Sequence, residues 1–63
     1  MQEHQLRVVK EQEELELKLD KLGLFIKTDM FKTLEYLEQN RLARQHEAMF
    51  QYNTILKERI NAF

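Results

Sequence analysis

Apolar residues recur at alternating steps of four and three through the first half of this chain. That spacing is typical of one face of an α-helix that packs against another helix. The seam passes through Val8, Gln12, Leu15, Leu19, Leu22 and Ile26. We therefore expect a first helix at about residues 2–27.

A second seam predicts a second helix, at about residues 35–61. It passes through Leu42, Gln45, Met49, Tyr52, Leu56, either Arg59 or Ile60, and Phe63. The pattern breaks between the helices, where Thr28 or Asp29 would cap a short connector helix at about 28–34. A connector this short makes the long helices antiparallel neighbours.

The residue content agrees with an all-α fold. Pro is absent and Gly23 is the one glycine, whereas the tight turns of sheet proteins need such residues. Inside a helix, Gly23 would cost about 1 kcal/mol relative to Ala, but it would let the two helices approach closely. The 63 residues suffice for a single domain spanning 1–63, an antiparallel two-helix hairpin with a short connector helix.

Several apolar residues lie outside these seams and would remain exposed on a lone hairpin. Chains this short that lack disulfides commonly gain stability by oligomerisation. We expect the hairpins to assemble into a homo-oligomeric helical bundle. The alternative is a compact three-helix monomer in which the connector folds back on the pair. The expected subunit interface consists of Leu17, Leu24, Phe25, Phe50, Ile55 and Phe63.

The charges argue against nucleic-acid or membrane partners. Ten Lys and Arg residues balance eleven Asp and Glu residues, and the two signs are interspersed along the chain. Nucleic-acid binding usually needs a concentrated basic face, and here only Arg41 and Arg44 form a small basic spot. No segment is apolar enough for a membrane span or a secretory signal, so we expect a cytoplasmic protein.

The sequence offers little for catalysis or metal binding. Ser and Cys are absent, which removes the commonest nucleophiles. His46 and Glu47 are followed by Phe50 where a zinc protease would need its second His. Ala43 stands where a di-iron bundle would need Glu. We therefore expect neither an enzyme nor a bound metal or cofactor.

Antiparallel pairing would gather polar residues near the open end of the hairpin. The cluster comprises Arg7, Glu11, Gln12, Tyr52 and Arg59, with Gln45 farther along the second helix. One interpretation is structural: the amides fix the helix register, and an arginine pairs with Glu11. The other is that two such clusters meet in an oligomer and bind an anionic, ring-containing ligand such as a nucleotide.

One run of residues resembles a family of small bacteriophage proteins named after a gene product of a crAss-like phage. In the second helix the matching residues are Glu38, Gln39, Arg41, Leu42, Gln45, Met49, Tyr52, Ile55, Leu56, Arg59 and Ile60. In the first helix they are His4, Gln5, Arg7, Val8, Val9, Glu11, Leu15, Phe25 and Ile26. The family's second helix usually starts with Ser or Asp followed by acids, whereas this chain has Glu35-Tyr36-Leu37.

The resemblance implies a phage accessory protein that acts by binding in the bacterial cytoplasm. One hypothesis is counter-defence, in which the protein sequesters a nucleotide-like immune signal at an oligomer interface. The alternatives are a protein-interaction module that inhibits a host or phage protein, and an RNA- or DNA-binding hairpin that uses Arg41 and Arg44.

Overall fold

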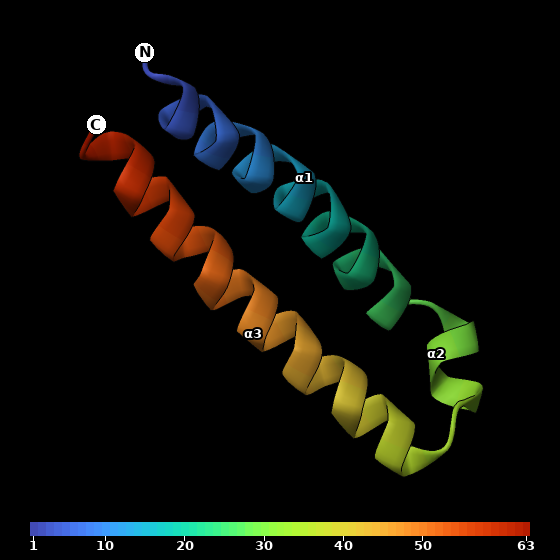
Figure 1. The fold of residues 1–63 in the computed structure, drawn as a ribbon. Coiled ribbons are helices and arrows are strands. Elements are labelled where there is room, and N and C mark those ends of the chain that lie inside the picture. The colour runs from blue at the N-terminus through green and yellow to red at the C-terminus, as the bar shows by residue number, and fades with distance from the viewer.

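The protein is an antiparallel helical hairpin. The computed structural model describes residues 1–63 as α1 (Glu3–Ile26), α2 (Asp29–Thr33) and α3 (Tyr36–Asn61). The helices α1 and α3 run side by side in opposite directions, so both termini lie at one end and α2 closes the other (Figure 1). The molecule measures 46 × 14 × 13 Å, and the connector caps the hairpin without folding back along it. The predicted all-helical hairpin with a connector helix is confirmed.

The core lies along the seam between α1 and α3. The predicted first seam is confirmed at Val8, Gln12, Leu15 and Leu19, which are buried. On α3 the central residue is Leu56, whose side chain is 1% exposed and packs with Val8 and Leu15. Burial of apolar surface between these helices is the main stabilising contribution.

The seam predicted for α3 is wrong at three positions, Gln45, Tyr52 and the terminal Phe63, which are exposed. Asn53 is buried and His46 is half-buried instead. From Leu42 the chain permits two registers, and apolarity alone favours the one through Tyr52. The structure adopts the register through His46 and Asn53. Asn53 is hydrogen-bonded to an amide on α1, and His46 packs against Gly23, which has no side chain.

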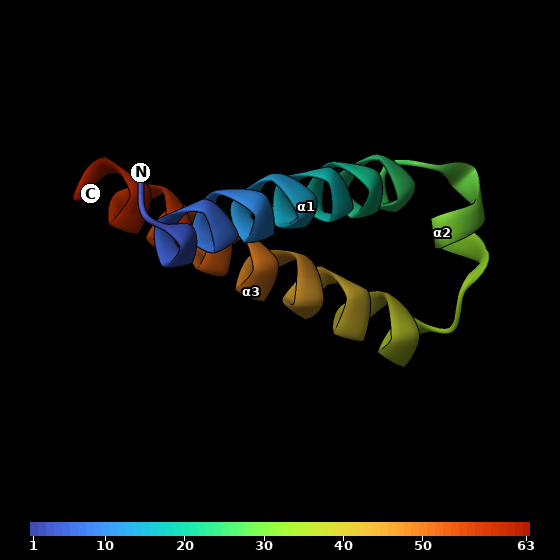
Figure 2. The same cartoon turned by 45° about the horizontal axis from the view of Figure 1, so that its top comes forward.

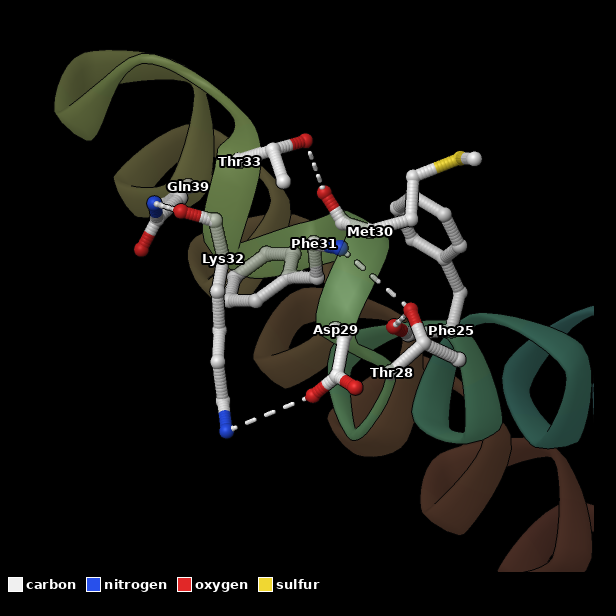
Figure 3. A network of polar contacts seen from close by, with 8 residues as sticks. All are labelled: Phe25, Thr28, Asp29, Met30, Phe31, Lys32, Thr33 and Gln39. Atoms are coloured by element: carbon white, nitrogen blue, oxygen red, sulfur yellow. Dashed lines mark hydrogen bonds and ion pairs between the residues drawn. The ribbon is translucent and has the colours of Figure 1, made fainter.

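The connector helix begins at a side-chain cap. The Thr28 hydroxyl accepts a hydrogen bond from the Phe31 backbone N–H at 3.3 Å, as predicted for a cap at this position (Figure 3). The Phe31 ring stands edge-on to the Phe25 ring, with centroids 6.1 Å apart. The helix α3 starts without a side-chain cap, and the Gln39 amide instead donates to the Leu34 carbonyl at 2.8 Å.

The helices α1 and α3 diverge toward α2 (Figure 2). Leu22, Ile26, Phe31, Leu34 and Leu42 are half-buried there, whereas the buried core lies nearer the termini. None of the helices combines the length and apolarity required to cross a membrane.

Candidate functional site

A chain of polar contacts crosses the seam near the middle of the hairpin. Gln12 donates from Nε2 to Asn53 Oδ1 at 3.1 Å, and both side chains are buried. Asn53 Nδ2 donates to Glu16 Oε1 at 3.4 Å, and Lys57 Nζ lies 2.7 Å from the same oxygen. The hydrogen bond from Lys57, assisted by that from Asn53, lowers the pKa of the Glu16 carboxyl. These polar contacts fix the register of α1 against α3 within an otherwise apolar core.

This network also defines two faces of the hairpin. Successive residues of an α-helix are rotated by about 100°. Glu16 and Lys57 contact one another, so they lie on the same side of the seam. Glu11 and Tyr52 are rotated from the seam in the opposite direction on their own helices, so they share the other side. We call the first side the groove face and the second the arginine face.

The arginine face carries five of the six predicted ligand residues. Helical rotation places Arg7, Glu11, Gln45, Tyr52 and Arg59 there, all of them exposed. Gln45 lies about 10 Å from Tyr52 along α3, at about 1.5 Å per residue. Gln12, the sixth, is buried in the seam, where its amide is bonded to α3.

The ion pair predicted for this face, between Glu11 and either Arg7 or Arg59, does not form within one chain. Arg7 instead pairs with Glu3 on its own helix, with Nη2 to Oε1 at 2.8 Å. No hydrogen bond or ion pair within the chain involves Glu11, Tyr52 or Arg59 through its side chain. These groups are therefore free to contact a ligand or a second subunit.

The predicted interface residues are spread over several sides of the hairpin. Leu17 and Leu24 lie on the outer edge of α1, and Ile55 lies on the outer edge of α3, each more than half exposed. Phe50 borders the groove face, and Phe25 packs partly against Phe31. Phe63, at the C-terminus, is 46% exposed. In a single chain these six side chains do not form one continuous patch.

The groove face is hollowed where the helices begin to diverge. The groove has a volume of about 620 Å³, within the range of small-molecule sites. Its floor includes Leu19, Gly23, His46 and Asn53, and its rim carries charged residues and the Phe50 ring. The full lining is Glu16, Leu19, Asp20, Gly23, Leu24, Lys27, His46, Phe50, Asn53 and Lys57.

Sequence analysis missed this groove because the predicted apolar seam gave neither His46 nor Asn53 a position between the helices. The one available signal was Gly23, whose internal position suggested a close helix approach. A Cβ built on Gly23 would lie 3.2 Å from His46 Nε2, so it is the His46 ring that comes close to α1. No cluster of three or more His, Asp or Glu side chains is arranged to hold a metal ion.

Comparison with known proteins identifies one family. Residues 2–62 match the model of the Sequestin family, which is nearly the whole chain. Neither the curated proteins nor the solved structures gave a match. Since the match covers both long helices and the connector, the chain belongs to the Sequestin family.

Proposed function

We propose that this protein acts by binding, and that it captures a small anionic, nucleotide-like ligand between subunits. The family name denotes sequestration, which agrees with a protein that holds a ligand without transforming it. The observation that carries the proposal is the arginine face: Tyr52 and Arg59 are exposed together with no partner in the chain. An arginine fork recognises phosphate, and a tyrosine ring offers a stacking surface for a base.

Self-association is part of the proposal because one hairpin leaves much apolar surface in water. Six residues are buried, whereas eleven large apolar or aromatic side chains are exposed. Pairing of subunits would cover a share of this surface. Arginine faces that meet across a two-fold axis would present two copies of Arg7 and Arg59 to one ligand.

The proposed setting is the bacterial cytoplasm during phage infection, where the ligand would be a nucleotide immune signal. This context comes from the resemblance to small phage proteins. Capture of such a signal requires no catalytic residue, no metal and no cofactor of the protein's own.

Isothermal titration calorimetry with cyclic nucleotides and ADP-ribose derivatives tests the proposal. We expect binding by the native protein and loss of about tenfold or more in affinity for Arg59→Gln, in line with one charge-assisted contact. Arg44→Gln is the matched control, since Arg44 lies on the outer part of α3 and bonds to Asn40 at 3.0 Å. Absence of binding across the panel would refute the proposal.

That negative result would favour an alternative function, inhibition of a host or phage protein. The supporting observation is the apolar closed end, where Met30, Tyr36 and Leu37 are each more than half exposed. Nucleic-acid binding through Arg41 and Arg44 has less support, because Arg41 pairs with Glu38 at 2.8 Å and Arg44 is held by Asn40. A gel-shift signal that weakens as the salt concentration rises would support nucleic-acid binding.

A further inference from the structure

The groove face holds a second set of groups that the arginine face does not use. Three side chains along the groove, those of Asp20, Lys27 and His46, form no hydrogen bond or ion pair with the rest of the chain. The remaining charged pair, Glu16 and Lys57, is mutually neutralised at 2.7 Å. The groove thus has one free carboxylate and one free ammonium, with an unbonded imidazole between the helices.

These groups have a defined order along the groove. Asp20 and Phe50 border the part next to the Glu16–Lys57 pair, Gly23 and His46 follow, and Lys27 lies nearest the closed end. Asp20 and Lys27 are seven residues apart on α1, which is about 10 Å at 1.5 Å per residue. The Phe50 ring is 54% exposed and therefore has a free aromatic face at the acidic end of the groove.

The absence of a side chain at residue 23 lets the His46 ring pack closely against α1 at the floor of the groove. A Cβ there would lie 3.2 Å from His46 Nε2 and 3.7 Å from His46 Cδ2. The imidazole therefore lies across α1 at this point, and neither of its nitrogens bonds to the protein. A methyl group at residue 23 would require the imidazole to shift by a few tenths of an ångström.

We infer that this groove is a binding site, complete within one chain, for a flat ring that carries a single anionic group. The ring would stack on Phe50 and donate a hydrogen bond to Asp20. The anionic group would lie toward Lys27 and His46, at the other end of the groove. A nucleoside 5′-monophosphate has this chemistry, with donors on its base or ribose and a phosphate at the distance that separates the two ends.

This site goes beyond the proposed function, because it needs no second subunit and shares no residue with the arginine face. It also gives Phe50 a role other than subunit contact. The two roles of Phe50 are distinguishable. If Phe50 is a subunit contact, its truncation changes the oligomeric state, whereas if it stacks on a ligand, its truncation changes the ligand affinity.

The experiment is an amide NMR titration of the full chain with adenosine 5′-monophosphate, followed for two variants and two matched controls. We expect shifts centred on Gly23, His46 and Phe50 in the native protein. Phe50→Ala should weaken binding by about fivefold to a hundredfold, the range for one stacked base. Phe63→Ala, at a comparably exposed aromatic outside the groove, should leave affinity and shifts unchanged.

The charge contribution is tested in the same titration. Lys27→Gln should weaken binding and reduce its salt dependence, since one phosphate contact is removed. Lys32→Gln is the control, because Lys32 lies on α2 and its ammonium pairs with Asp29 at 3.8 Å (Figure 3). Light scattering on Phe50→Ala should give the same molar mass as for the native protein.

Three results would overturn the inference. They are absence of groove shifts at millimolar probe, equal weakening by the Phe63 and Phe50 variants, and a changed molar mass for Phe50→Ala. Shifts confined to Arg7, Tyr52 and Arg59 would also reject the groove, yet they would support the proposed function. Groove shifts that survive Arg59→Gln would support this site whatever happens at the arginine face.

Discussion

The buried amide pair gives the sharpest prediction about how this hairpin is held together. Gln12 and Asn53 are 9% and 5% exposed, and the 3.1 Å bond between them joins α1 to α3. Replacing Asn53 with Leu leaves the Gln12 amide buried without its partner. An unsatisfied buried amide costs about 1–3 kcal/mol of unfolding free energy. We therefore expect Asn53→Leu to lower the stability by that amount, although leucine is the more apolar residue.

The double variant Gln12→Leu/Asn53→Leu should behave differently. Both polar groups are then removed together, so no buried amide is left without a partner, and the seam becomes continuous from Val8 to Leu19. Replacement of both members of a buried polar pair is often neutral or stabilising. The double variant should thus be at least as stable as the native protein, with a coupling energy of about 1 kcal/mol or more.

Urea unfolding followed by circular dichroism at 222 nm measures all four proteins of this cycle. Each is measured at two protein concentrations, because a dimer would make the midpoint concentration-dependent. Additive effects of the two single substitutions, within about 0.5 kcal/mol, would show that the amide pair contributes no specific coupling and would refute the reasoning.

Three further predictions concern the core, the groove floor and the ion pair. Leu56→Ala should lower the unfolding free energy by about 2–5 kcal/mol in the same urea assay, because its 1% exposed side chain leaves a cavity. Helix propensity alone predicts that Gly23→Ala raises the unfolding free energy by about 1 kcal/mol. The increase should be smaller here, because the new Cβ would lie 3.2 Å from the His46 ring, and it should reach its full value in a His46→Ala background. The folded-state pKa of Glu16 is lowered, so its stabilising effect is present at neutral pH and is lost as pH falls through that pKa. Lys57→Met should make the melting temperature fall less steeply as the pH is lowered, as measured by thermal melts at a series of pH values. An unchanged pH dependence of the melting temperature would contradict the assignment.

The helices themselves were predictable from the spacing of apolar residues. Val8, Leu15 and Leu19 repeat at helical intervals, and Thr28 is a cap residue placed where the repeat stops. Local signals of this kind do not depend on what the helix packs against, and they give element type and order reliably.

The register of the second helix was not predictable in the same way. From Leu42, steps of three, four and three lead through Gln45 and Met49 to Tyr52, whereas steps of four, three and four lead through His46 and Met49 to Asn53. Hydrophobicity favours Tyr52, but a buried asparagine is stable when a second amide faces it. That partner, Gln12, lies 41 positions away in the sequence, so only the assembled hairpin shows that the two amides meet.

The same limit applies to the candidate sites. The arginine face combines residues whose helical rotation could be worked out from the sequence, and five of the six predicted residues share that face. The groove includes Gly23 in its lining and lies between helices that diverge toward α2 (Figure 2). No spacing within either helix indicates how far two helices diverge.

The central claim is that this Sequestin protein holds a small anionic ligand as an assembly of hairpins. Native mass spectrometry of the gently purified protein, first alone and then with a nucleotide panel, tests it most directly. We predict an oligomer that carries a stoichiometric added mass of nucleotide size, and a loss of that mass in Arg59→Gln. A bare monomer that ignores every nucleotide in the panel would contradict the claim.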